Sequence, residues 1–207
     1  TTIESRWSVG PDADHLLTFV QTIAPVWATE MNEHGTVAIQ YEVLNNTGVN
    51  VAVEARLLLD TALGGQDYGY YEVTTTQGQA YERISAERTI TDAALQIPAN
   101  FFAYDDFETP SITAYTVNDM AEGGVKPYQI TFAHWNNLAA TVFDYTPDPG
   151  LTFTNKYNAE YLTADSAYAL YYDLGSVGSG ATADFHTYYG IYSNLNVSRG
   201  SKFSINI

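Results

Sequence analysis

The sequence predicts an all-β protein, folded as an antiparallel β-sandwich, and two observations support this prediction. Short stretches rich in β-branched and aromatic residues recur along the chain, with turn-forming residues between them. No stretch has the strong 3.6-residue apolar period of an amphipathic helix. The 207 residues are 45% hydrophobic and include no cysteine, so the core must be held by burial alone. Because no repeat or charged linker divides the chain, we expect a single domain over residues 1–207.

The first third of the chain gives the clearest strand patterns. Residues 3–9 alternate weakly and residues 16–23 are β-branched, so we expect a strand in each, whereas residues 25–34 have no clear period and should be irregular. Residues 36–71 predict a hairpin, because two alternating arms flank a turn-forming segment at residues 45–48. If both apolar faces point the same way, Val43 lies opposite Val51.

The remaining expected strands share β-branched and aromatic content between turn signals. They comprise residues 71–75 paired with 79–84, an extended piece ending at 97–98, and residues 112–117, 128–133, 167–172, 183–192 and 202–207, while residues 101–104 lead into an acidic loop. Residues 136–143 fit either a short helix or a strand.

The charge of the chain excludes several classes of function. Eight Lys and Arg residues stand against 24 Asp and Glu residues, giving a formal net charge of −16. With no basic patch, we expect no nucleic-acid partner, and an anionic membrane surface would repel the protein. No apolar run reaches the ~18 residues of a membrane-spanning helix, so we expect no membrane insertion.

Aromatic residues next to polar ones form three candidate ligand sites. The chain has 17 Tyr, 9 Phe and 3 Trp, and several of these rings stand beside Gly, Asp and Asn rather than in apolar runs. The candidate sites are Gln66, Asp67, Tyr68 and Tyr70 in a glycine-rich loop; Trp135, Asn136 and Asn137; and Tyr104, Asp105 and Asp106. A sugar needs this combination, since its C–H face stacks on a ring while its hydroxyls need directed partners. Alternatively, the rings pack inside the sandwich with their hydroxyls at its rim.

The carboxylates leave three interpretations open. Asp60 ends a predicted strand and Asp67 follows seven residues later, while Asp105, Asp106 and Glu108 form a second group. They could be a solvated acidic surface, ligands for calcium, or the carboxylate pair of a glycoside hydrolase. Neither spacing matches a known calcium loop, so we expect no cofactor, with calcium the one possible metal. The four histidines lack metal-binding spacing, and no GxSxG or phosphate-loop motif is present.

A series of short motifs in a fixed order resembles a known family. The motifs are Ser5 to Gly10 (SRWSVG), Tyr41 to Gly48 (YEVLNNTG), Leu58 to Asp67 (LLDTALGGQD), Ile97-Pro98, Ala103 to Phe107 (AYDDF), Lys126-Pro127 with Phe132 and Trp135, Phe143 to Tyr145 (FDY), Asp165 to Tyr172 (DSAYALYY) and Thr187 to Gly190 (TYYG). The series is similar to a β-rich module of large surface and exported proteins of Gram-positive gut bacteria. The tyrosine content and size also resemble a starch-binding domain of the cell-surface starch-adherence system (amylosome) of Ruminococcus. Where such modules often carry Ala-Pro-Phe after the loop Asp, Tyr68-Gly69-Tyr70 stands here.

The resemblance implies a non-catalytic, extracellular role at the bacterial surface or in secreted form, within a larger protein. Together with the aromatic clusters, it leads us to expect binding of a polysaccharide or oligosaccharide, with maltooligosaccharide and starch as the first candidates. Two alternatives remain open: a structural or adhesive spacer module, and a glycoside hydrolase. The first predicts that the aromatic clusters are buried, and the second requires two carboxylates facing each other across a cleft.

Overall fold

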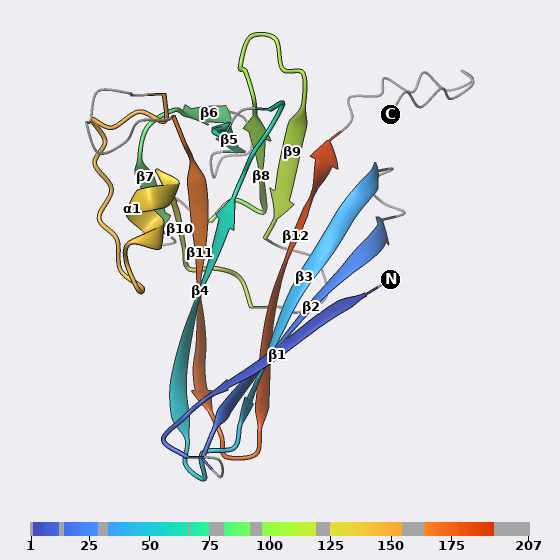
Figure 1. Ribbon diagram of the computed structural model, residues 1–207, viewed down its shortest axis with the longest axis vertical. Helices are drawn as coiled ribbons and strands as arrows, with labels where there is room; N and C mark the ends of the chain where they lie inside the picture. The colour runs from blue at the N-terminus through green and yellow to red at the C-terminus, as the bar shows by residue number, and fades with distance from the viewer. Residues whose placement is uncertain are drawn as a thin grey trace.

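The computed structural model describes residues 2–12, 15–28, 33–65, 67–74, 81–91, 97–118, 125–154 and 164–192, except for the side chains of residues 27, 28 and 33–35. Two antiparallel sheets pack face to face, with one short helix beside them (Figure 1), so the predicted all-β sandwich is confirmed. Among the described residues, no helix is long and apolar enough to cross a membrane.

The larger sheet has eight strands. In spatial order they are β1 (Ile3–Val9), β2 (Leu17–Ala28), β3 (Glu33–Asn45), β12 (Thr182–Tyr192), β9 (Thr113–Val117), β8 (Asn100–Tyr104), β5 (Tyr70–Thr74) and β6 (Tyr81–Ile84). The smaller sheet has the order β4 (Val51–Asp60), β11 (Ala167–Val177), β10 (Gln129–Ala133) and β7 (Arg88–Thr91). The helix α1 (Trp135–Ala139) follows β10 directly.

The core lies between the two sheets and is rich in aromatic rings. Tyr71 and Phe101 of the larger sheet meet Phe132 and Tyr168 of the smaller one, and all four side chains are at most 1% exposed. The ring centroids of Tyr71 and Phe132 are 4.6 Å apart, and those of Phe101 and Tyr168 are 4.9 Å apart. Such pairs contribute about 0.5–1.5 kcal/mol each beyond the burial of their area. Some of the many tyrosines, among them Tyr71 and Tyr168, are therefore core residues.

The predicted hairpin at residues 36–71 is wrong, because its two arms belong to different sheets. Strand β3 pairs with β2 and β12, whereas β4 pairs with β11. In Figure 1 the two strands diverge from the turn that joins them. The apolar faces of the two arms enter the core from different sheets, where Val43 and Val53 are both buried in one cluster, instead of sharing one face. The alternating pattern fits this arch as well as it fits a hairpin, because both bury one face of each strand.

Two other expectations are decided by the described residues, and one is not. Residues 25–34 were expected to be irregular, but β2 continues to Ala28, with Pro25 opposite Val37, and β3 begins at Glu33. Ile23 is the last residue of β2 that pairs with β1, so at Pro25 the strand has β3 as its neighbour on one side only. Proline, which has no N–H to donate, is tolerated at such an edge position. The segment that fitted helix or strand begins as the helix α1. The strand expected at residues 202–207 lies outside the described residues.

A second, smaller apolar cluster holds α1 against the outer face of the smaller sheet. Leu138 is fully buried and packs with alanines of the sheet and with Tyr171. Arg56 of β4 donates hydrogen bonds of 2.8 Å to the carbonyl oxygens of Leu138 and Thr141. These contacts fix the helix and the residues that follow it.

Candidate functional site

A line of half-buried aromatic side chains, which we call the ring strip, runs across the outer face of the larger sheet. The ring strip comprises, in spatial order, Tyr68, Tyr70, Phe107, Tyr104, Phe102 and Tyr192. Successive ring centroids along this order are 5.8, 4.8, 5.9, 6.3 and 5.1 Å apart. Each ring thus contacts the next, and every one of them keeps part of its surface in solvent.

Strand alternation explains why these rings point outward. Tyr71 of β5 and Phe101 and Ala103 of β8 are buried in the core, so their neighbours Tyr70, Phe102 and Tyr104 project from the opposite face. The antiparallel pairing places Tyr70 directly opposite Tyr104. The structure therefore brings together two clusters that the sequence offered separately, the glycine-rich loop and the Tyr104 segment.

The loop after β8 holds Phe107 in the strip by means of two carboxylates. Asp105 accepts hydrogen bonds from the backbone N–H groups of Ser111 (2.9 Å) and Ile112 (3.2 Å) and from the Ser111 hydroxyl. Burial alone would raise the pKa of Asp105, but these hydrogen bonds outweigh it and lower the pKa below its ordinary value. Asp106, which is exposed, accepts hydrogen bonds from the N–H groups of the two residues after Phe107, at 2.7 and 2.8 Å, and these lower its pKa as well.

The glycine-rich loop packs directly on Asp105. Gly64 has φ of +60°, and a Cβ atom built at this position would lie 2.5 Å from Oδ2 of Asp105. Only glycine fits both the left-handed backbone and this close approach. The loop that carries Tyr68 is thereby seated against the loop that carries Phe107.

Charged groups line the ring strip near its middle. The guanidinium of Arg83 lies over Phe107, with its Cζ atom 4.7 Å from the ring centroid, and pairs with Glu108 at 3.2 Å and Glu72 at 3.7 Å. The Tyr104 hydroxyl donates a hydrogen bond of 3.2 Å to Glu72. Burial, followed by the negative charge of Glu72, raises the pKa of Tyr104, so its hydroxyl keeps its proton at neutral pH.

The second predicted platform lies on the other outer face of the sandwich. Trp135 is 37% exposed and Asn136 is exposed, both on α1, which covers the smaller sheet. Asn137 donates a hydrogen bond of 2.8 Å to Glu87. This platform is a single exposed ring, separate from the ring strip.

Glu87 is buried and holds together, by hydrogen bonds, the segments around α1. It is 2% exposed, and its two oxygens accept four hydrogen bonds. The donors are the backbone N–H groups of His134 and Asp148, the side-chain amide of Asn137 and the hydroxyl of Tyr145. A buried carboxylate with four donors ties the start of α1 to the segment after it.

Three carboxylates, one of them in the glycine-rich loop, lie close together, and we call them the acidic triad. The acidic triad comprises Asp60, at the end of β4, Asp67, in the loop, and Asp165, just before β11. One carboxylate oxygen from each lies within 4.8 Å of the other two. Burial and then the negative charges of Asp60 and Asp67 raise the pKa of Asp165 to about 6, and burial and Asp67 raise the pKa of Asp60. Such a cluster can hold a cation or retain a proton.

Of the predicted site residues, Gln66 lies outside the described residues, and the others divide among three places. Tyr68, Tyr70 and Tyr104 lie in the ring strip, with Asp105 and Asp106 in the loop that holds Phe107. Asp67 belongs to the acidic triad, and Trp135, Asn136 and Asn137 lie on α1. Phe102, Phe107, Tyr192 and Asp165 were not proposed from the sequence. The alternation of residues 101–104 could have indicated Phe102, but Tyr192 and Asp165 reach these sites only through pairing of distant strands.

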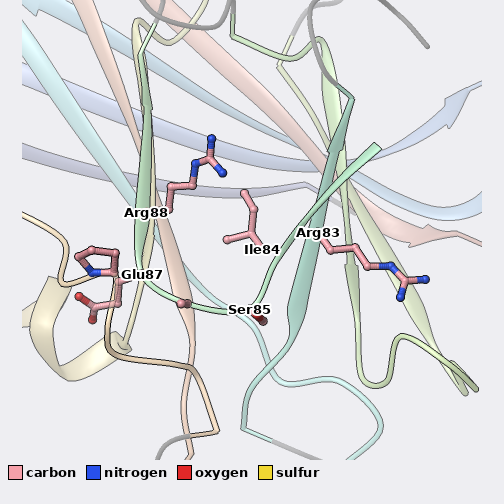
Figure 2. A pocket seen from close by; sticks show the side chains of 7 residues that line it. Arg83, Ile84, Ser85, Glu87 and Arg88 are labelled. Atoms are coloured by element: carbon pink, nitrogen blue, oxygen red, sulfur yellow. The ribbon is translucent and has the colours of Figure 1, made fainter. Parts of the chain in front are cut away.

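A hollow of about 390 Å³ lies at the bend between β6 and β7, and none of the predicted site residues lines it (Figure 2). It is lined by residues 83–88 and Pro149. Figure 2 shows Arg83 and Arg88 leaving opposite arms of the bend. Both guanidinium groups are already paired, Arg83 with Glu72 and Glu108, and Arg88 with Glu82. The positive charges at the hollow are therefore neutralised by the protein itself.

Comparison with models of known protein families gives no match to this sequence, and comparison with curated proteins gives none either.

Proposed function

We propose that this protein is a non-catalytic polysaccharide-binding module and that the ring strip is its binding face. The observation that carries the proposal is the row of contacting, partly exposed rings on the outer face of a sheet. These rings are a different set from those of the core between the sheets. Pyranose rings present flat C–H faces that stack on such aromatic surfaces, and an extended glycan can contact several rings in succession.

The polar groups beside the strip supply directed partners for sugar hydroxyls. Arg83 lies over Phe107 and pairs with Glu72 and Glu108, and the exposed Asp106 lies in the same loop as Phe107. Charged side chains give stronger hydrogen bonds than neutral ones, and their positions select which hydroxyls fit. A site of this kind should bind an oligosaccharide with a Kd between about 1 mM and 1 μM.

The choice of α-glucan, the extracellular location and membership of a larger bacterial surface protein rest on the motif resemblance. Starch and maltooligosaccharides are therefore the first ligands to test.

The spacer alternative is favoured by one specific observation. Several polar groups expected to contact hydroxyls already serve the protein: Asp105 and Asp106 fix their loop, the Tyr104 hydroxyl donates to Glu72, and Asn137 donates to Glu87. If the ring strip binds no glycan, these hydrogen bonds serve only to make the module rigid, as a spacer in a surface protein requires.

The test is isothermal titration calorimetry with maltoheptaose, supported by gel retardation in a panel of soluble glucans. Tyr70→Ala and Tyr68→Ala should each weaken binding by about tenfold or more, because each removes a stacking face of the strip. Trp135→Ala, which removes an exposed ring on the other outer face, is the matched control and should bind as the wild type does. Absence of heat and of retardation with every glycan would overturn the proposal in favour of the spacer. Release of reducing sugar would instead indicate the hydrolase.

A further inference from the structure

The acidic triad is assembled from three separate segments of the chain. Asp60 ends β4 and lies opposite Ala167 in the pairing of β4 with β11, which brings it next to Asp165. Asp67 approaches from the loop between β4 and β5. With oxygens within 4.8 Å of one another, three formal negative charges occupy one small volume. None of the ion pairs formed among the described residues includes a triad carboxylate.

Asp165 gives an independent indication that the triad lacks a partner. Its side chain is only 7% exposed, and its buried Oδ1 atom has no hydrogen-bond partner among the described residues. A buried carboxylate oxygen without a partner costs about 1–3 kcal/mol or more, so native proteins rarely leave one in this state. A bound cation would satisfy that oxygen and remove the repulsion among the three charges together.

We propose that Asp60, Asp67 and Asp165 bind a divalent cation, and that the cation is Ca²⁺. Oxygens on opposite sides of a calcium ion, each at 2.3–2.6 Å, are about 5 Å apart, so the spacing of the triad fits one coordination sphere. Three carboxylates supply three to six of the six to eight oxygens that calcium takes. Water can supply the rest, because Asp60 and Asp67 are exposed.

The ligand set distinguishes calcium from other divalent ions. All three side chains offer hard oxygen ligands, whereas zinc sites in proteins are built mainly from His and Cys. Magnesium requires a near-ideal octahedron at shorter distances and loses its water reluctantly. A site that joins one buried and two exposed carboxylates from different segments has the variable geometry that calcium tolerates.

The surroundings of the triad hold it in place before any ion arrives. The backbone N–H of Ser166 donates to the carbonyl oxygen of Asp67 at 3.3 Å. The Ser166 hydroxyl accepts from the N–H of Gly69 at 2.7 Å and also interacts with the hydroxyl of Tyr71 at 3.2 Å. The Asp67 loop is thus fastened to the residue that follows Asp165, so little ordering of the chain opposes binding.

The experiment compares thermal unfolding in EGTA with unfolding in millimolar CaCl₂, without any glycan, so that its outcome does not depend on the proposed function. At a calcium concentration 100 times the Kd, the wild-type unfolding temperature should rise by about 5–10 °C. Calorimetric titration of the EGTA-treated and dialysed protein with CaCl₂ should show a single site. Magnesium at the same concentration should give a clearly smaller rise.

Substitutions in the triad separate ion binding from simple structural damage. Asp165→Asn should unfold at or above the wild-type temperature in EGTA, because it removes repulsion, and below it in calcium, because it removes a ligand. Asp67→Asn, at an exposed position, should lose the calcium response without losing the fold. Asp184→Asn, an exposed carboxylate of β12 outside the triad, should keep the full response. A wild type that does not respond to calcium, or triad variants that respond as strongly as the wild type, would overturn the proposal.

Discussion

Asp105 illustrates how a single residue acquires its role only from the folded loop around it. Its position after Tyr104 suggested a group that contacts sugar hydroxyls, and in the structure it accepts hydrogen bonds from within its own loop. The sequence could not reveal this, because the donors follow six and seven residues later in a segment without a regular pattern.

The stability contributed by Asp105 should depend on pH. A carboxyl group whose pKa is lower in the folded than in the unfolded protein stabilises the fold above its unfolded pKa, and this contribution disappears as the pH falls through the folded pKa. Asp105→Asn should lower the free energy of unfolding by about 1–2 kcal/mol at neutral pH, and the difference should shrink below about pH 4. Urea unfolding at several pH values measures it, and a difference that stays constant down to pH ~2 would contradict the assignment.

Glu87 carries a second prediction about a single side chain. Replacement by Ala leaves four buried or partly buried donors without their acceptor, so we expect a loss of about 3–5 kcal/mol in the free energy of unfolding. Asp144→Asn, an exposed carboxylate near the same segment, should change stability by less than about 0.5 kcal/mol. Equal effects of the two substitutions in urea unfolding would show that Glu87 does not organise the region around α1.

Among the elements, strand positions were readable from the sequence but strand partners were not. Alternation located β3 and β4, because one face of each is buried, and β-branched and aromatic content located β12. The same alternation could not decide whether residues 45–50 form a hairpin turn or an arch between sheets. That choice depends on β11 and β12, which lie more than 100 residues later and provide the pairing partners.

Asn45 should be the residue on which this arch depends. It is fully buried, and its amide donates hydrogen bonds to the carbonyl oxygens of Val49 (2.7 Å) and Val177 (2.8 Å), joining the arch of β3 and β4 to the turn after β11. Asn45→Ala should lower the free energy of unfolding by about 2–4 kcal/mol. The neighbouring Asn46 is exposed, so Asn46→Ala is the matched control, and chemical denaturation of both variants gives the comparison. A stable Asn45→Ala variant would mean that strand pairing alone sets the arch.

At the scale of the whole molecule, the two outer faces of the sandwich differ in kind. The larger sheet carries the ring strip, whereas the smaller sheet is covered by α1 and the second apolar cluster. The sequence identified rings of both faces but could not sort them, because tertiary packing decides which share a surface. The union of the Tyr68 loop with the Tyr104 segment follows from the pairing of β5 with β8.

The acidic triad and the ring strip should be linked through the loop that carries both Asp67 and Tyr68. If both proposals hold, calcium orders Tyr68 before a glycan arrives, so EGTA should weaken maltoheptaose binding by a few-fold. Asp67→Asn should bind the glycan with the weakened affinity whether or not calcium is present. If the protein binds calcium but its affinity for maltoheptaose is the same with and without EGTA, the two sites act independently.

The most direct test of the ring strip as a binding face is an NMR titration of the protein, labelled in its aromatic rings, with maltoheptaose. The ring signals of Tyr68, Tyr70 and Phe107 should move together along one saturable curve, while the Trp135 indole signal stays in place. Movement of Trp135 with an unchanged strip, or no movement of any ring at millimolar glycan, would contradict the account.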